Sequence, residues 1–267
     1  MNRTIVITGA SSGIGAALAR ALTGQNLVLA ARRREELVAV AREVSGRAVV
    51  TDVTRREDVI RLRDEALRAF GSVDVWVNNA GRGITRPVLE LTDADFDEMM
   101  AVNVKSALYG MQAIVPHFIE RKRGHVINIS SFLGRVPIAT HRSAYNAAKA
   151  ALNALTANAR VDLQSKVPDI HVSLVMPGLV STEFARNAVG SSGGAPPPWV
   201  AGGPMQPQSA QEVAAAIAAV IEHPVAEIYT NPASAAMARR YFEDVGAFEE
   251  GLYTRSAPRG PRPAERG

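Results

Sequence analysis

The segment TIVITGASSGIG, residues 4–15, decides the fold predicted for this chain. An apolar run over 3–8 predicts a buried strand, which leads through a glycine-rich turn into a helix predicted from residue 14. The glycines of the turn let a ligand approach the backbone and let the helix pack on the strand. Such a turn directs backbone N–H groups and the positive end of a helix at a phosphate, so it predicts a dinucleotide site. By itself the pattern also fits an ordinary tight strand-to-helix turn.

Short apolar runs alternate with amphipathic helical patterns along the chain. Continuous β-branched runs such as Val126 and Ile127 indicate strands covered on both faces. The alternation predicts a Rossmann-type, doubly wound parallel sheet of about seven strands with helices on both faces, formed by one α/β domain over 1–253. Strands are predicted at 3–8, 26–31, 47–50, 73–78, 125–130, 170–176 and 226–229, and helices at about 14–24, 33–44, 55–70, 92–121, 143–165 and 209–222.

The composition excludes several classes of protein. The 267 residues are 47% hydrophobic and include no cysteine, which excludes disulfides, thiolate metal sites and cysteine nucleophiles; no metal site is predicted. No apolar run approaches a membrane span, and the early first strand leaves no room for a signal peptide, so we expect a cytoplasmic protein without a membrane partner. The net charge is +4, of which residues 254–267 carry +3, as four arginines against one glutamate. The remainder is near neutral, so nucleic acid is not expected as a partner.

Two segments depart from the regular alternation. Residues 190–208 are rich in glycine and proline and follow the sixth predicted strand, at the edge where open α/β sheets bind ligands. This loop is predicted to be a substrate lid with Trp199 as an apolar anchor, the alternative being a flexible surface loop. A helical extension is predicted at about 232–252, and residues 254–267 are predicted to be a basic, disordered tail.

Tyr145 and Lys149 are the clearest catalytic candidates. They are four residues apart in a predicted helix, so both side chains lie on one face. An ammonium beside a phenol favours the phenolate and lowers the pKa of the tyrosine, which then transfers a proton near neutral pH. The spacing is common, and it gains meaning from the glycine-rich turn in the same chain.

A serine hydrolase is the alternative from another class of enzyme. Residues 9–13 also read G-x-S-x-G, the nucleophile-elbow pattern, with Ser11 as nucleophile. That reading requires an oxyanion donor from the loop of an earlier strand, and no strand is predicted before residue 3. None of the five histidines lies in a recognisable catalytic context.

Taken together, the motifs closely resemble the short-chain dehydrogenase/reductase family, in its short single-domain branch. Residues 8–15 match the family's T-G-x-x-x-G-x-G and residues 78–81 its N-N-A-G. Asn103 matches the helix asparagine, Ser131 ends the fifth strand before the tyrosine motif, and Pro177 with Gly178 follows the sixth strand. The resemblance covers residues 4 to about 230 and fades in the lid and beyond residue 232.

The resemblance implies a catalytic role for four side chains. Tyr145 should be the general acid in reduction, and Lys149 should lower its pKa and hold the ribose hydroxyls. Ser131 should hydrogen-bond the substrate oxygen, and Asn103 should order a water that links Lys149 to solvent. The family's second serine usually lies thirteen residues before the tyrosine, and here one extra residue accommodates Ser131, whereas Ser130 would need two.

The resemblance also implies the cofactor and its contacts. In relatives that prefer NAD an acidic residue ends the second strand; here Ala31 stands there and Arg32 follows, which predicts NADP(H) over NAD(H) because a guanidinium binds a phosphate. Arg32 could instead belong to a solvated helix start, and Asp52 could merely cap a helix. The predicted cofactor contacts are Gly9, Ser11, Ser12, Gly13, Ile14, Gly15, Arg32, Arg33, Asp52, Val53, Asn79, Ala80, Gly81, Tyr145, Lys149, Pro177, Gly178, Val180 and Thr182.

The predicted function is therefore an NADP(H)-dependent oxidoreductase that transfers a hydride between nicotinamide and a carbonyl or secondary alcohol. Apolar residues near the tyrosine indicate a substrate with a hydrophobic body. The resemblance implies a homodimer or homotetramer. A scaffold or sensor that binds NADP(H) without turnover remains the alternative. The apolar residues are Phe132, Leu133, Val136 and Ile138.

Overall fold

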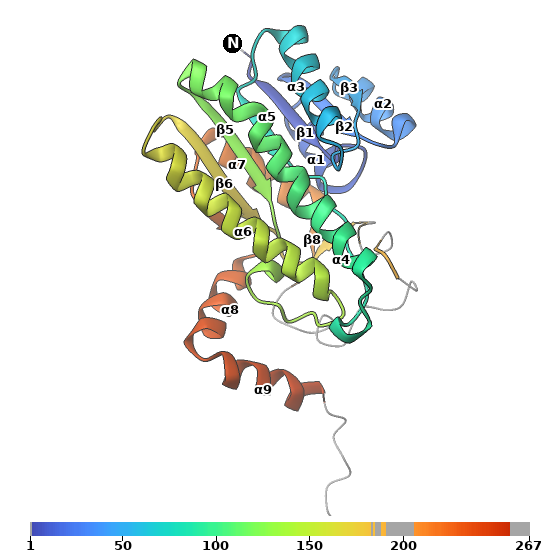
Figure 1. Ribbon diagram of the computed structural model, residues 1–267, viewed down its shortest axis with the longest axis vertical. Coiled ribbons are helices and arrows are strands. Elements are labelled where there is room, and N and C mark those ends of the chain that lie inside the picture. The colour runs from blue at the N-terminus through green and yellow to red at the C-terminus, as the bar shows by residue number, and fades with distance from the viewer. Residues whose placement is uncertain (1, 183, 185–187, 191–205, 257–267) are drawn as a thin grey trace, which may run out of the picture.

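A parallel seven-stranded sheet forms the centre of the molecule (Figure 1). The computed structural model describes residues 2–182, 184, 188–190 and 206–256, and for 253–256 only the backbone. Trp199, most of the predicted lid and the tail beyond residue 256 lie outside the described residues. The strands are β1 (Thr4–Thr8), β2 (Asn26–Ala31), β3 (Arg47–Val50), β4 (Val75–Asn78), β5 (Gly124–Ile129), β6 (Ile170–Met176) and β9 (Glu227–Tyr229).

The strand order is β3-β2-β1-β4-β5-β6-β9, and every neighbouring pair is parallel. The chain thus builds outward from β1 in one direction and from β4 in the other, which confirms the predicted doubly wound, Rossmann-type sheet. Ligands bind such sheets in the crevice where the order reverses, beyond the carboxyl ends of the strands.

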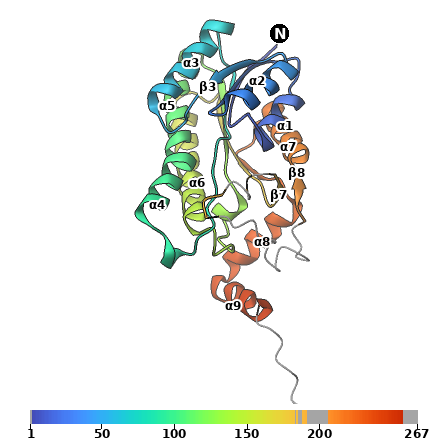
Figure 2. The ribbon, with the colours of Figure 1, turned by 90° about the vertical axis from the view of Figure 1, so that its right-hand side faces the viewer.

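Helices cover both faces of the sheet (Figure 2). Alternate residues of β1 point to opposite faces, so Ile5 and Ile7 pack with α1, α2 and α7, whereas Val6 packs with α3, α5 and α6. The helices are α1 (Gly13–Ala21), α2 (Arg34–Glu43), α3 (Arg56–Phe70), α4 (Asp93–Met100), α5 (Ser106–Arg121), α6 (Ser143–Gln164), α7 (Ala210–Glu222), α8 (Pro232–Glu243) and α9 (Val245–Ser256). None of the helices that the structure describes is long and apolar enough to cross a membrane.

The helix predicted over 92–121 is interrupted. It begins at a capping box in which Thr92 and Asp95 satisfy each other's backbone N–H groups, and α4 ends at Met100. A π-helical turn, Ala101–Lys105, then joins α4 to α5. Such turns hold one extra residue and often occur at functional sites; this one contains Asn103.

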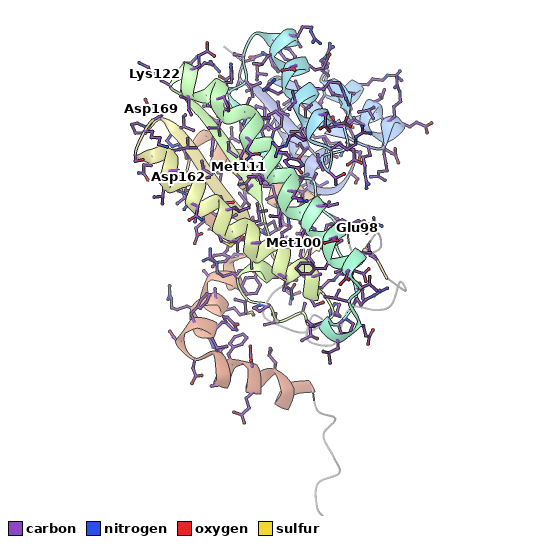
Figure 3. All side chains as sticks on the ribbon, in the orientation of Figure 1. Glu98, Met100, Met111, Lys122, Asp162 and Asp169 are labelled. Atoms are coloured by element: carbon purple, nitrogen blue, oxygen red, sulfur yellow. The ribbon has the colours of Figure 1, made fainter. Side chains whose placement is uncertain are left out.

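The region beyond the sheet also differs from the prediction. A short parallel pair that was not predicted, β7 (Val180–Ser181) with β8 (Gln208–Ser209), flanks the segment predicted to be a lid. The predicted extension forms two helices, α8 and α9, which extend away from the sheet (Figure 1). Lys122 and Asp169 lie at the amino ends of β5 and β6, far from Glu98 of α4 (Figure 3). The carboxyl ends of the strands therefore face the end of the molecule that holds Glu98.

Candidate active site

A cavity of about 790 Å³ opens beyond the carboxyl ends of the central strands. Its size is within the range of cofactor and ligand sites. Every predicted site residue lines it except Gly15 and Asn103, which support it from behind. Residues from positions 9 to 182 are thereby brought to one edge of the sheet.

Gly9 and Gly15 shape the turn after β1. Gly9 has φ +69°, and a Cβ atom there would lie 2.8 Å from the Cα atom of Ala80. A Cβ atom on Gly15 would lie 2.4 Å from the carbonyl oxygen of Gly9. Glycine at 9 therefore lets two loops approach each other, while glycine at 15 lets α1 start directly on the turn.

The turn is held by hydrogen bonds to the loop after β4. The Nδ2 atom of Asn79 donates to the carbonyl oxygen of Thr8 at 2.8 Å. In return, the hydroxyl oxygen of Thr8 accepts from the backbone N–H groups of Asn79 and Ala80 at 3.0 and 3.1 Å. Asn79 thus positions the glycine turn as well as lining the cavity.

The start of α1 fits a phosphate group. Ser12 occupies the N-cap position, but its side chain makes no capping hydrogen bond, and no acidic residue lies in the first turn. The first backbone N–H groups of a helix need acceptors, and an anion supplies them. The Arg33 guanidinium adds positive charge by donating to the hydroxyls of Ser12 at 2.7 Å and Ser11 at 3.2 Å. A dinucleotide diphosphate would suit this cradle.

The adenosine end of the cavity lies beside the end of β2. Arg33 is engaged with Ser12 and with Glu36 at 3.3 Å, whereas no residue that the structure describes pairs with the exposed Arg32. Asp52 lines the cavity and also accepts from the backbone N–H and hydroxyl of Thr54 at 3.0 and 2.7 Å. Asp52 therefore does not cap α3, whose N-cap residue is Arg55, but forms a local turn with Thr54 while lining the cavity.

Tyr145 and Ser131 form the centre of the site. The Tyr145 side chain is 8% exposed and is hydrogen-bonded to that of Ser131, whose oxygen also accepts from the backbone N–H of Leu133 at 3.1 Å. Ser130 instead donates to Asn153 Oδ1 at 2.5 Å. This arrangement supports Ser131 over Ser130 as the partner of the tyrosine.

Lys149 is buried beside Tyr145 but directed elsewhere. It is 3% exposed, and its Nζ atom donates to the carbonyl oxygen of Ile129 at 2.8 Å. Burial lowers the pKa of Lys149 to about 7.

The expected lowering of the pKa of Tyr145 is wrong for this structure. Burial raises that pKa to about 12, because it penalises the phenolate more than the hydrogen bond from Ser131 and the charge of Arg142 favour it. The cation that acts on the phenol is Arg142, while the Lys149 ammonium itself loses charge through burial.

Asn103 supports the cavity wall from the π-helical turn. Its Nδ2 atom donates to the carbonyl oxygens of Arg82 at 2.9 Å and Met99 at 3.1 Å, and its Oδ1 atom accepts from the backbone N–H of Arg82 at 3.2 Å. A Cβ atom on Gly81 would lie 3.0 Å from Asn103 Oδ1 and 3.6 Å from Lys149 Nζ, so glycine keeps these two side chains near each other. The water-ordering role of Asn103 stays a prediction.

Several cavity residues were not predicted. Phe184 places its ring edge-on to that of Tyr145 at 5.5 Å, and Met237 reaches the cavity from α8; neither belongs to a local motif. Arg142 precedes Tyr145 by three residues, a helical spacing that could have been read from the sequence. Among the apolar residues expected near the tyrosine, Val136 packs in the core with Ala238 instead. The other residues of the wall that were not predicted as contacts are Ala31, Thr51, Thr54, Arg82, Gly83, Val102, Ile129, Ser130, Phe132, Leu133, Ile138, Leu179 and Ala188.

The hydrolase alternative lacks its catalytic base. The Ser11 hydroxyl accepts from Arg33, and none of the described residues lining the cavity is a histidine. A serine nucleophile needs a base within hydrogen-bonding reach. Across the described part of the chain, no group of three His, Cys, Asp or Glu side chains could hold a metal ion.

The chain belongs to the short-chain dehydrogenase family, whose model, described as short chain dehydrogenase, matches residues 3–191. An uncharacterized oxidoreductase from Staphylococcus epidermidis is 32% identical over 188 residues, which make up 69% of this chain and 80% of that protein. A dehydrogenase/reductase SDR family protein 7-like from Anopheles gambiae is 33% identical over 232 residues, or 81% of this chain and 72% of that protein.

Solved structures agree with this family. A short chain dehydrogenase/reductase from Burkholderia phymatum in complex with NAD superposes with a TM-score of 0.80 at 27% identity, covering 97% of both chains. An alcohol dehydrogenase from the archaeon Thermococcus sibiricus, complexed with 5-hydroxy-NADP, gives 0.73 at 28% identity and covers 86% of this chain and 97% of its own. The chain is thus an oxidoreductase of a family whose members bind nicotinamide dinucleotides.

Proposed function

We propose that this chain is an NADP(H)-dependent oxidoreductase that acts on a carbonyl compound or the corresponding secondary alcohol. The observation that carries the proposal is the buried Tyr145 hydroxyl, hydrogen-bonded to Ser131 in the same cavity as a glycine cradle fitted for a diphosphate. The substrate is a small molecule with a hydrophobic body, because Phe132, Leu133 and Phe184 line the wall near the tyrosine.

Each side chain has a distinct task in reduction. The nicotinamide supplies the hydride to the carbonyl carbon when the cofactor is bound. Ser131 holds the carbonyl oxygen by a hydrogen bond, and the Tyr145 hydroxyl gives that oxygen its proton. A pKa near 12 keeps Tyr145 protonated and ready to donate over the whole physiological range. The charge of Arg142 and the charged form of Lys149 stabilise the phenolate that forms.

The preference for NADP(H) is supported by the residues at the end of β2. Ala31 lines the cavity where a carboxylate would repel a 2′-phosphate, and Arg32 beside it has no partner among the described residues. A guanidinium binds phosphate with two parallel hydrogen bonds and can stack on adenine. The Arg33 guanidinium donates to the hydroxyls of Ser11 and Ser12 and adds to the positive charge beside the end of β2.

A substrate screen tests the proposal. NADPH oxidation would be followed with a panel of ketones and aldehydes, and NADP⁺ reduction with the matching alcohols, with NAD(H) as the comparison. We expect turnover of at least one carbonyl class with NADPH. Tight NADPH binding, seen as a change in cofactor fluorescence, without turnover of any substrate would favour the scaffold or sensor instead.

We propose a homodimer or homotetramer in the cytoplasm, with one domain over 1–253. The long helices present some apolar surface to a second copy, since Ile119 of α5 is 43% exposed and Val161 of α6 is 68% exposed. Light scattering on the purified protein would measure the assembly, and a monomer at micromolar concentration would contradict it.

A further inference from the structure

The cavity wall carries a strong excess of positive charge. Its described residues include one carboxylate, Asp52, which lies on the adenosine side and is bonded to Thr54. Some of the positive charge is explained by a phosphate-bearing cofactor. The cations of the wall are Arg32, Arg33, Arg82, Arg142 and Lys149.

Arg142 is the cation that the cofactor does not explain. It lies immediately before α6, and its Nη1 atom is fully buried without a hydrogen-bond partner among the described residues. A buried charged donor without a partner is unfavourable, so such a group in a native protein calls for an explanation. Burial also lowers the pKa of this guanidinium.

Neighbouring arginines differ from Arg142 in this respect. Arg82 also lines the cavity, but it is paired with the carboxylate of Glu98. Arg86, whose backbone forms a bridge with that of Arg142, is paired with Asp95 at 2.6 Å. The first turn of α6 contains no acidic residue, so the helix supplies no counter-charge from its own start.

Arg142 lies at the substrate end of the cavity. A Cβ atom on Gly83 would lie 2.7 Å from Arg142 Nη1 and 2.9 Å from Phe184 Cε1, so both side chains meet over this glycine. The Phe184 ring contacts that of Tyr145, and Arg142 is near enough to lower the pKa of the tyrosine. The guanidinium is therefore close to the hydroxyl that delivers the proton.

We propose that the substrate carries a carboxylate that binds Arg142, a few carbon atoms from the carbonyl group that Tyr145 protonates. The reaction is then reduction of an oxo acid to a hydroxy acid, or its reverse. The inference rests on the proposed function and names its substrate class. In reduction the carbonyl carbon gains the hydride of NADPH, the oxygen gains the proton of Tyr145, and the carboxylate is unchanged. The planar guanidinium can donate two parallel hydrogen bonds to the two oxygens of a carboxylate.

Matched acids and esters test the inference. The values of kcat/KM with NADPH would be measured for acetoacetate and levulinate and for the methyl ester of each, so that each pair differs by one charge. We expect the acids to be preferred by the wild type. Arg142→Gln should lower kcat/KM for the acids by about 10²-fold more than for the esters, mainly through KM, because the acids lose a buried charged partner for their carboxylate. The esters lose only the charge that stabilises the phenolate of Tyr145.

Two further variants control this measurement. Arg142→Lys keeps the positive charge but lacks the planar guanidinium, so it should retain part of the preference for the acids that Arg142→Gln loses. Arg86→Gln removes a nearby arginine that already has a partner, and it should keep the wild-type ratio of acid to ester. Equal losses for acids and esters in Arg142→Gln, with a shifted pH profile, would mean that Arg142 only tunes Tyr145 and would overturn the inference.

Calorimetry separates failure of the inference from failure of the proposed function. Levulinate and its methyl ester would be titrated into the full-length protein saturated with NADP⁺. Acid binding that depends on Arg142, without turnover of any substrate, would uphold the carboxylate site and refute the enzymatic proposal. Turnover of neutral ketones with no preference for acids, in rate or in binding, would uphold the enzymatic proposal and refute the carboxylate site.

Discussion

The Lys149 ammonium nitrogen lies 5.7 Å from the centroid of the Tyr145 ring, and both side chains are almost completely buried. Burial disfavours a charge on either group, so the pKa of Lys149 falls to about 7 while that of Tyr145 rises to about 12. Groups with strongly shifted pKa values in a cavity are typical of functional sites. The protein thus keeps a buried cation at a cost in stability, which predicts how mutants will behave.

Lys149→Met should stabilise the protein while removing its activity. The folded state holds Lys149 at a pKa near 7 instead of 10.5, a shift that corresponds to about 5 kcal/mol of unfavourable free energy. The full free-energy cost of burying this charge applies below pH 7, where Lys149 is protonated in both the folded and the unfolded state. The cost disappears as the pH rises from 7 to 10.5. The gain in the free energy of unfolding should therefore approach about 5 kcal/mol at pH 6 and shrink toward pH 10.

Urea unfolding of the wild type and of Lys149→Met across this pH range checks the prediction. Lys166→Met is a suitable control, because Lys166 is exposed near the end of α6. A loss of stability in Lys149→Met at pH 6 would show that the bond to Ile129 outweighs the cost of burying the charge.

Tyr145→Phe should abolish turnover and spare cofactor binding. The substitution deletes one hydroxyl and keeps the ring that packs edge-on against Phe184. Loss of a positioned general acid lowers kcat by about 10²–10⁴-fold. NADPH titration by fluorescence should give a dissociation constant within about threefold of the wild type, because the substitution removes one neutral hydroxyl and no charge. Near-normal turnover in this mutant would exclude Tyr145 as the proton donor.

Gly9→Ala should damage the cofactor site more than its backbone conformation alone would explain. A side chain at φ +69° costs about 1–2 kcal/mol, and its Cβ atom would also press on the Ala80 backbone at 2.8 Å. Gly71→Ala is the matched control, since Gly71 has φ +74° and no heavy atom within 4 Å of the added Cβ atom. We expect a similar strain in both and a large loss of NADPH affinity in Gly9→Ala alone. Equal affinities in the two mutants would contradict the close approach at Ala80.

The sequence predicted the fold well because its signals are local. The apolar run of β1 and the glycines that follow define a strand, a turn and a helix by themselves, and the seven strands of the sheet begin and end within about two residues of their predicted limits. The π-helical turn at Asn103 was missed, because an extra residue inside a continuous helical pattern leaves no break in hydrophobic spacing.

The chemistry of the site was harder to predict than its position. Spacing placed Tyr145 and Lys149 on one helical face, but the direction of each pKa shift depends on how deeply the rest of the fold buries them. Met237 and Phe184 reach the cavity from segments remote from Tyr145 in the sequence, so no motif around Tyr145 predicts that they line it. That Arg142 Nη1 has no hydrogen-bond partner among the described residues likewise depends on the folded chain and cannot be read from the sequence.

The last prediction concerns the choice between the two nicotinamide cofactors. Ala31 ends β2 and is one of the residues that line the cavity, and Arg32 follows with an exposed side chain that no described residue engages. A 2′-phosphate would supply the missing partner, whereas a ribose hydroxyl carries no charge for it. We therefore expect NADPH to bind more tightly than NADH. Ala31→Asp combined with Arg32→Ala should reverse this order, because the new carboxylate repels a phosphate and accepts hydrogen bonds from the ribose hydroxyls.

Fluorescence titration of both cofactors against the wild type and the double mutant measures the switch. Losing one charged hydrogen-bonding partner should weaken NADPH binding by about 10–10²-fold, and NADH binding should change little or improve. Arg34→Ala is the control: Arg34 belongs to the same basic run, but it starts α2 and lies outside the cavity wall. Its removal lowers the general positive charge by the same amount, so it should change NADPH affinity only slightly and in a salt-dependent way. Equal affinity of the wild type for both cofactors, or an equal effect of Arg32→Ala and Arg34→Ala, would refute the assignment of the phosphate site to Arg32.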